Sequence, residues 1–275
     1  MKSIALFASL LAAGAAVASS VSSSTTFGVL KIPSHNAQTV VSVPWVAAGS
    51  GNDVKVKDFV KTTGMTEGDQ LYLYNTTGDN AGKFTGWVLD NNAWVAAKVV
   101  SDEDPETVDT PADFGSTQVV RDENATIAQG SALVIVRTAA NITDDIYIYG
   151  QYKADSLTNF PVGFSTSAKF TTLFAPINLT GSAIHLNDQK NGSSQYLSWT
   201  NAKKGDKIRL QDANGNVVTY TYTTGGKWSY SNSDTLGLTG TLQPGQGAWY
   251  VACADAERTA APYCTITTSS AAAAE

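Results

Sequence analysis

One segment of the sequence occurs twice. The stretch Gly68–Trp94 returns as Gly205–Trp228: a Gly-Asp pair opens an alternating strand, a turn rich in Asn, Asp and Gly follows, and a second strand leads to a Trp. Both copies then continue to a Gly-led apolar strand, one from Ile127 and one from Leu242. Alternation with a period of two residues is typical of strands with one buried face. The repeat therefore predicts two similar β units in tandem.

The composition agrees with this prediction. Only 15% of the residues are charged, and Gly and Tyr are frequent, which favours β structure outside the cell over a helical enzyme inside it. The segment 53–61 could form a strand or a single helical turn, and we favour the short helix. We predict an all-β fold of two tandem antiparallel β-sandwich or small-barrel domains related by an internal repeat.

The domain boundaries follow from the repeat and from breaks in the apolar pattern. The first β domain is expected at 27–153 and includes an acidic, Pro-containing loop at 101–115 that the second copy lacks. A linker at 154–159 leads to the second β domain at 160–268. The last residues, 269–275, have no apolar segment to anchor them and are expected to be disordered.

The N-terminal 18 residues read MKSIALFASLLAAGAAVA. Lys2, an apolar run and the A-x-A pattern at Ala16–Ala18 predict a secretory signal peptide, followed by a flexible polar leader at 19–26. The apolar run is shorter than the roughly 20 residues that span a bilayer. We therefore expect a secreted, extracellular or cell-surface protein with no membrane span.

The formal net charge is −6, and no Lys/Arg cluster is present. An acidic chain of this kind lacks the electrostatic footprint of a nucleic-acid binder. The expected partners are other extracellular proteins or glycans, with self-association as a further case.

Two cysteines, Cys253 and Cys264, lie near the C-terminal end. In an oxidising compartment two such residues are expected to form one disulfide that closes a short loop. A pair of lone thiols is a poor zinc site, because structural zinc takes four ligands.

Candidate catalytic groups are few. The two histidines, His35 and His185, lie in no nucleophile or metal motif, and we interpret both as ordinary turn or surface residues. The repeat-related acids Asp69 and Asp206 could serve as a glycosidase pair. An Asp that follows Gly at the start of a strand is more typical of a turn cap, so we predict no catalytic residues.

The acidic loop is the best candidate for a metal site. Asp102, Asp104 and Asp109 carry the oxygen ligands that Ca²⁺ prefers, although their spacing matches no calcium motif, and a solvated loop is the simpler interpretation. No other cofactor is expected. The segment Asp212–Asn216 resembles the start of an EF-hand loop, but it lies between two strand patterns and predicts a hairpin turn.

Aromatic side chains are concentrated in the repeated segments. The tryptophans at 94, 228 and 249 are expected in the core, because two copies of one fold need the same large side chain to fill each core. The tyrosines that alternate along the strands are expected to line one sheet face, where they would suit stacking on sugar rings. These candidate ligand-binding residues are Tyr72, Tyr74, Tyr220 and Tyr222.

The leading functional hypothesis is a secreted, non-enzymatic β-repeat protein that acts in extracellular or cell-surface structure, adhesion or assembly. The alternative is a tandem carbohydrate-binding module that uses the four tyrosines. A secreted glycoside hydrolase ranks third, because it requires two acids to converge in one cleft.

Overall fold

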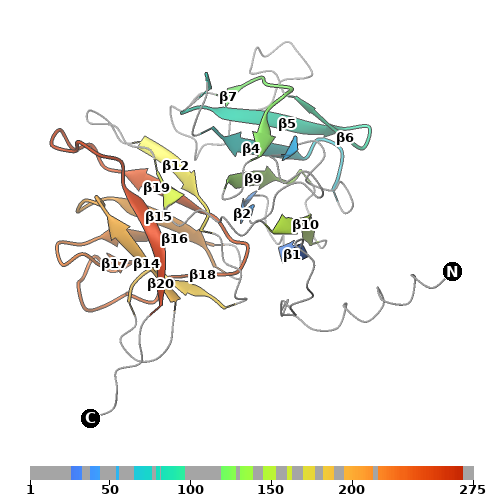
Figure 1. The fold of residues 1–275 in the computed structure, drawn as a ribbon. Coiled ribbons are helices and arrows are strands. Elements are labelled where there is room, and N and C mark those ends of the chain that lie inside the picture. The colour runs from blue at the N-terminus through green and yellow to red at the C-terminus, as the bar shows by residue number, and fades with distance from the viewer. Residues whose placement is uncertain are drawn as a thin grey trace.

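A computed structural model describes residues 26–32, 38–43, 54–55, 65–75, 79–80, 82–96, 119–127, 131–138, 145–152, 160–162, 170–176, 182–188, 195–212 and 216–268. Every regular element in these residues is a β-strand (Figure 1), so the predicted all-β class is confirmed. The predicted signal peptide, the leader up to residue 25, the acidic loop, the linker and the tail lie outside the described residues. Val54 and Lys55, expected in a helical turn, form a strand instead.

The first unit is built on a six-stranded sheet with the order β2–β9–β4–β5–β6, and β7 pairs with β5 beside this path. A separate pair, β3 with β8, completes it. The strands are β2 (Gln38–Ser42), β3 (Val54–Lys55), β4 (Gln70–Tyr74), β5 (Phe84–Asp90), β6 (Ala93–Ala96), β7 (Val119–Val120), β8 (Thr126–Ile127) and β9 (Ala132–Val136).

The second unit contains two five-stranded sheets, with the orders β12–β19–β15–β16–β17 and β11–β20–β14–β13–β18. Residues of both sheets, such as Tyr250 and Leu197, share one buried core. The strands are β11 (Phe160–Pro161), β12 (Phe170–Phe174), β13 (Ile184–His185), β14 (Gln195–Thr200), β15 (Lys207–Gln211), β16 (Val217–Tyr222), β17 (Trp228–Ser229), β18 (Thr241–Leu242), β19 (Ala248–Ala252) and β20 (Tyr263–Thr268).

Most strand pairs are antiparallel, as predicted. Two pairs are parallel, β5 with β7 and β13 with β14. Within the described residues, no sheet closes on itself. The described residues therefore form no small barrel. Several open, mainly antiparallel sheets make up the fold.

The sheet of the first unit and the β12–β19–β15–β16–β17 sheet of the second unit have the same pairing register. Leu71 lies opposite Trp87 and Ile135, and Ile208 lies opposite Tyr220 and Tyr250. The two tryptophans that end the repeated segments also correspond, since Trp94 pairs with Leu89 and Trp228 with Tyr222. Both are buried, as is Trp249, so the prediction that these three residues are core is confirmed.

The two units are packed against each other. Val40, Tyr72 and Phe84 of the first unit share a buried cluster with Leu173 and Trp249 of the second. The backbone also joins them: the amide of Ser42 donates to the carbonyl of Gly245 at 2.8 Å, and the amide of Gly247 to that of Val40 at 3.0 Å. A side chain at position 247 would place its Cβ 2.9 Å from Val40, so this close approach requires glycine.

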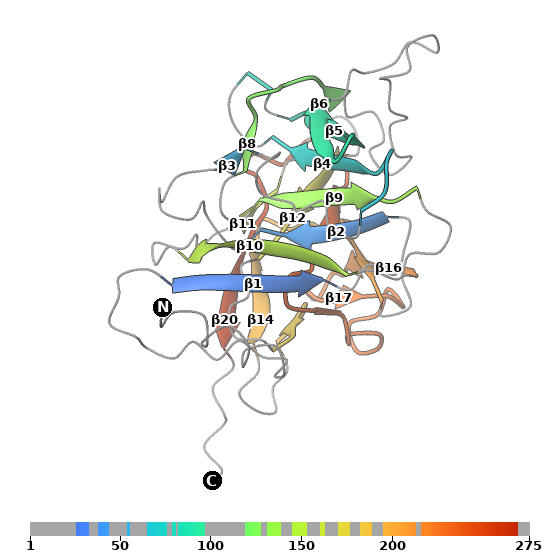
Figure 2. The same cartoon turned by 90° about the vertical axis from the view of Figure 1, so that its right-hand side faces the viewer.

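A two-stranded ribbon lies beside β2 (Figure 2), and among the described residues it makes no strand pairing with these sheets. Its strands, β1 (Thr26–Ile32) and β10 (Ile146–Tyr152), pair antiparallel over their whole length. In both views β10 lies between β2 and β1, so β1 is the outer strand. Lys31 forms an ion pair with Asp145, 2.6 Å away, at the end of the ribbon.

The described residues contain no helix with the length and hydropathy needed to cross a bilayer.

Candidate functional site

Asp69 lies in the turn that leads into β4, and its side chain is completely buried. One carboxylate oxygen accepts hydrogen bonds from the Thr66 amide at 2.9 Å and from Arg137 Nε at 2.8 Å. The other accepts from the amide and the hydroxyl of Thr138, at 2.8 and 3.0 Å. Gly68 precedes it with φ of 85°, a left-handed conformation that suits glycine.

Asp206 occupies the corresponding turn before β15 and is equally buried. One oxygen accepts from the Lys203 amide at 2.9 Å and from the Tyr250 hydroxyl at 2.5 Å. The other accepts from the Cys253 amide at 2.8 Å and from Arg258 at 2.7 Å. Burial favours the protonated form, but the hydrogen bonds from Arg258, Lys203, Tyr250 and Cys253 outweigh it and lower the pKa of the Asp206 carboxyl.

Both acids therefore act as turn caps and as partners in buried ion pairs. Asp69 and Asp206 each accept four hydrogen bonds, and each arginine of the two pairs is buried as well. In the second unit, these partners hold the Asp206 carboxyl ionised. The turn-cap interpretation of these two residues is confirmed. Sequence reasoning did not identify Arg137 or Arg258 as their partners.

The predicted disulfide between Cys253 and Cys264 is wrong, because the structure contains no bond between the two sulfur atoms. Cys264 lies on β20 and is buried in the core of the second unit. Cys253 follows β19 in the other sheet, where its thiol lies 3.5 Å from the Lys204 carbonyl and 3.6 Å from Arg258. The two cysteines are eleven residues apart in the sequence, and this spacing alone does not indicate that they belong to different sheets.

Both thiols have a raised pKa. Burial is the largest cause for Cys253, and the hydrogen bond and charge of Asp206 add to it. Burial alone raises the pKa of Cys264. Since the thiolate is the reactive form, neither residue is activated as a nucleophile.

The four candidate tyrosines do not form an exposed platform. Tyr72 and Tyr74 lie in the buried cluster between the two units, and burial raises the pKa of Tyr74 to about 12. Tyr220 is buried in the core of the second unit, and Tyr222 packs against the same core. Stacking on a sugar ring requires an accessible ring face, which the buried Tyr72, Tyr74 and Tyr220 do not offer; Tyr222 is half-buried.

The remaining predicted residues have separate locations. His185 is half-buried on β13, whereas His35 lies outside the described residues. Asp102, Asp104 and Asp109 of the calcium candidate also lie outside them. In the part of the chain that is described, no three metal-ligating side chains gather in one place. The backbone of Asp212 bonds to that of Asn216 at 2.9 Å, which confirms the hairpin turn predicted there.

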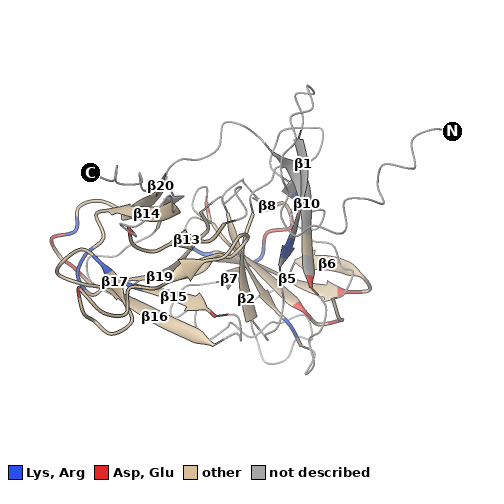
Figure 3. Cartoon of the chain, turned by 90° about the horizontal axis from the view of Figure 1, so that it is seen from below, with Lys and Arg blue, Asp and Glu red and all other residues tan. Residues whose placement is uncertain are grey.

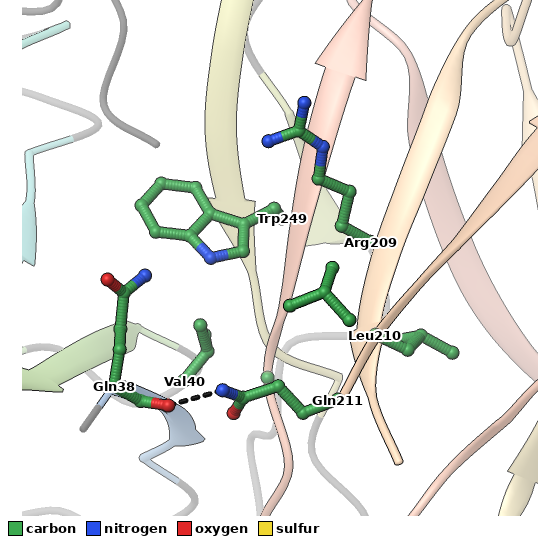
Figure 4. Close-up of a pocket in the computed structure, with 8 residues that line it drawn as sticks. Gln38, Val40, Arg209, Leu210, Gln211 and Trp249 are labelled. Atoms are coloured by element: carbon green, nitrogen blue, oxygen red, sulfur yellow. Dashed lines mark hydrogen bonds between the residues drawn. The ribbon is translucent and has the colours of Figure 1, made fainter. Parts of the chain in front are cut away.

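A pocket of about 80 Å³ lies where the two units meet (Figure 4). Its polar lining comes from Gln38, Arg209 and Gln211, and its apolar lining from Val40, Leu210, Val217, Gly247 and Trp249. In Figure 4 the Trp249 indole lies between the side chains of Gln38 and Arg209. The side-chain amide of Gln211 donates to the backbone carbonyl of Gln38, and that of Gln246 donates to the Gln211 carbonyl at 2.7 Å.

A second candidate surface is the loop after β17. Tyr230 and Leu236 are 59% and 66% exposed, and they are held close together because the Tyr230 amide donates to the Gly237 carbonyl at 3.1 Å. The hydroxyls of Ser229 and Ser231 both donate to the Leu236 carbonyl, at 2.7 and 2.9 Å. The loop thus holds two large side chains toward solvent on an ordered backbone.

Charged residues are present in both units, in small separate groups (Figure 3).

Comparison with known proteins found no matching family model, no matching curated protein and no matching solved structure. The candidate sites therefore rest on the geometry of this chain alone.

Proposed function

We propose that this chain is a secreted, non-enzymatic protein that acts by association in extracellular or cell-surface structure, adhesion or assembly. In this proposal its two units are copies of one β unit, as the repeated segment predicts. The shared pairing register and the equivalent Asp-Arg pairs support the duplication. Two β units that share a buried cluster form a rigid support for a binding surface.

The β1–β10 ribbon is the observation that carries the proposal. Among the described residues, neither of its strands pairs with a third strand. Val29 is 51% exposed on the outer strand, and Tyr147 of β10 is 36% exposed. An isolated two-stranded ribbon is only marginally stable in water, and an open edge with few charges is a template for a further strand. The ribbon is thus the surface best suited to a protein partner.

The proposal is tested with the full chain expressed in its native secretion route. We expect the protein outside the cell, and we expect purified protein to bind the surface of the producing cells or itself in a saturable manner. Val29→Glu places a charge on the ribbon and should weaken this binding, whereas Thr126→Glu places the same charge on an exposed residue of β8 and should not. Protein retained inside the cell, or equal loss in both variants, would refute the proposal.

Carbohydrate binding is the second candidate, and the loop that carries Tyr230 favours it. The ring is exposed and lies 6.1 Å from Tyr220, edge-on to it, while the hydroxyls of Ser231, Ser233 and Thr235 surround the turn. A fixed aromatic ring with polar neighbours suits a sugar face. A glycan array read with wild-type protein and with Tyr230→Ala tests this: binding that the substitution abolishes supports the candidate, and a blank array excludes it.

A further inference from the structure

The chain contains five Asn-x-Ser/Thr sequences, the acceptor pattern for an N-linked glycan in a secreted protein. They begin at Asn75, Asn124, Asn141, Asn178 and Asn191. In a chain rich in Asn, Ser and Thr such sequences also arise by chance, so the surroundings of each asparagine have to decide. The structure describes the asparagines of the first two, whereas the other three lie outside the described residues.

Asn124 lies in the turn between β7 and β8 and is exposed. Its backbone amide donates to the Asp122 carboxylate at 2.9 Å, and the Ala125 amide donates to the Asp122 carbonyl at 3.4 Å. Along the turn and β8, alternate residues have opposite surroundings: Asn124 and Thr126 are exposed, whereas Ala125 and Ile127 are buried in the core of the first unit. Both side chains that define the acceptor sequence therefore face solvent.

The Asn124 side chain leaves its nitrogen accessible. Lys55 of β3 lies opposite Thr126 in the β3–β8 pair, and its Nζ donates to Asn124 Oδ1 at 3.3 Å. This bond uses the oxygen of the side-chain amide, and Nδ2 makes no hydrogen bond to the described residues. A sugar on Nδ2 keeps Oδ1 as an acceptor, so the contact with Lys55 is compatible with a glycan.

Asn75 has the same acceptor pattern and the opposite surroundings. It directly follows β4, and its Nδ2 donates to the Lys83 carbonyl at 3.0 Å and to the Thr85 hydroxyl at 2.7 Å. The Thr85 side chain is completely buried, so the Asn75 amide is directed into the protein. Both N–H groups of this amide are used, and a sugar on Nδ2 would replace one of them and require space beside a buried hydroxyl. The fold therefore has no place for a glycan on Asn75.

We propose that Asn124 carries an N-linked glycan and that Asn75 is unmodified in the folded protein. The donor is a lipid-linked oligosaccharide pyrophosphate. Asn124 Nδ2 forms a bond to the anomeric carbon of the first sugar, the bond from that carbon to the pyrophosphate oxygen breaks, and the lipid pyrophosphate leaves. The proton released from Nδ2 passes to a base of the transferring enzyme. This modification goes beyond the association role, but it rests on the secretion in the proposed function, because the transfer takes place in the secretory pathway.

The test uses the full chain from its native secretion route, digested with trypsin and treated with a peptide N-glycosidase in heavy-oxygen water. Cleavage after Lys and Arg places the two asparagines on separate peptides, residues 62–83 and 122–137, each with a single acceptor sequence. The N-glycosidase converts a glycosylated asparagine to labelled aspartate. By mass spectrometry we expect the label at Asn124 and none at Asn75.

The possible failures can be told apart. Secreted protein without label at Asn124 would overturn the glycan and leave the association role standing. Label at Asn75 in folded protein would overturn the argument from hydrogen bonding. Protein that stays inside the cell and carries no sugar would refute both the glycan and the proposed function.

Matched variants at the third position of each acceptor sequence assign the site without changing either asparagine. Thr126→Ala should abolish the label and increase the electrophoretic mobility of the secreted protein, and Thr126→Ser, which keeps a hydroxyl, should preserve both. Thr126 is exposed, so neither change disturbs the core. Thr77→Ala is the equivalent change beside Asn75 and should leave the sugar content unaltered. Sugar retained in Thr126→Ala, or lost in Thr77→Ala, would overturn the assignment.

The glycan can also be separated from ribbon binding. Thr126→Glu, the control for the Val29→Glu variant, removes the acceptor sequence of Asn124 as well as adding a charge. Unchanged surface binding in that variant, together with loss of the label, would show that the sugar is attached outside the binding surface.

Discussion

The two buried ion pairs, Asp69 with Arg137 and Asp206 with Arg258, perform the same task in the two units with arginines from different places. Arg137 directly follows β9, and by register its counterpart is Ala252, the last residue of β19. The second unit supplies its cation from Arg258 instead, beyond the end of β19. The turn before β4 and β15 thus requires a buried carboxylate and a counter-charge, and it does not require that the arginine come from a fixed position.

The outer faces of the same two sheets carry different side chains, whereas their inner faces are alike. The inner faces both hold large apolar side chains, Leu71 with Trp94 in the first unit and Ile208 with Trp228 in the second. The faces that meet between the units carry tyrosines in the first and polar residues in the second. The fold therefore requires large apolar side chains on the inner faces, whereas the side chains at the junction between the units differ in polarity.

The largest effect is expected from removing the charge of either carboxylate. Asp206→Asn leaves Arg258 buried without its counter-charge and should lower the free energy of unfolding by about 3–5 kcal/mol. Asp69→Asn should cost a similar amount, because Asp69 also pairs with a buried arginine and also accepts a hydroxyl bond, from Thr138. Urea denaturation of both variants measures the difference. Near-native stability in either variant would contradict the role given to these pairs.

Opening the junction between the units should cost less. Leu173 is buried in the shared cluster, and Leu173→Ala should lower the free energy of unfolding by about 2–5 kcal/mol, the usual range for buried leucine. Leu236→Ala is the matched control: its side chain is 66% exposed, and the change should stay within about 0.5 kcal/mol. Equal effects in the two variants would mean that the cluster does not hold the units together.

Acid should act on the second unit through Asp206. The pKa of this carboxyl is lower in the folded than in the unfolded chain, so ionised Asp206 stabilises the fold above about pH 4. This contribution is lost as the pH falls through the folded pKa. We expect an NMR titration of the Asp206 carboxyl carbon to give a midpoint below the ordinary value for Asp. A midpoint at or above that value would show that burial outweighs the hydrogen bonds.

Local pattern was enough to predict a large part of this fold. The alternating strands of the repeated segments, the hairpin turn at Asp212–Asn216 and the buried tryptophans follow from period, turn chemistry and repetition. The turn between β5 and β6 has similar chemistry, since Asn91 and Asn92 have positive φ, 48° and 59°, as a tight hairpin requires.

Contacts between distant segments were not predictable in the same way. Tyr72 and Tyr74 occupy what one unit alone would present as a solvent face, and the second unit covers it. Arg258 reaches Asp206 from a loop with no strand pattern. An alignment of the two repeats does pair Tyr72 with Arg209, and that change in polarity is the signal that could have pointed to the pocket.

The smallest expected effect compares two equivalent positions directly. Cys253 in the second unit stands where Thr138 stands in the first: the backbone amide of each donates to the neighbouring carboxylate at 2.8 Å. The Thr138 hydroxyl adds a further bond to Asp69 at 3.0 Å. Cys253→Thr should add the same bond to Asp206 and raise the free energy of unfolding by about 0.5–1.5 kcal/mol.

The reverse substitution, Thr138→Cys, removes that bond from the first unit and should lower the free energy of unfolding by a similar amount. Changes of the same sign in both variants would show that the two turns are not equivalent. Cys253→Thr also leaves Cys264 as the single thiol, and because that residue is fully buried, it should react with a thiol reagent only after unfolding. Rapid reaction in the folded variant would place Cys264 outside the core.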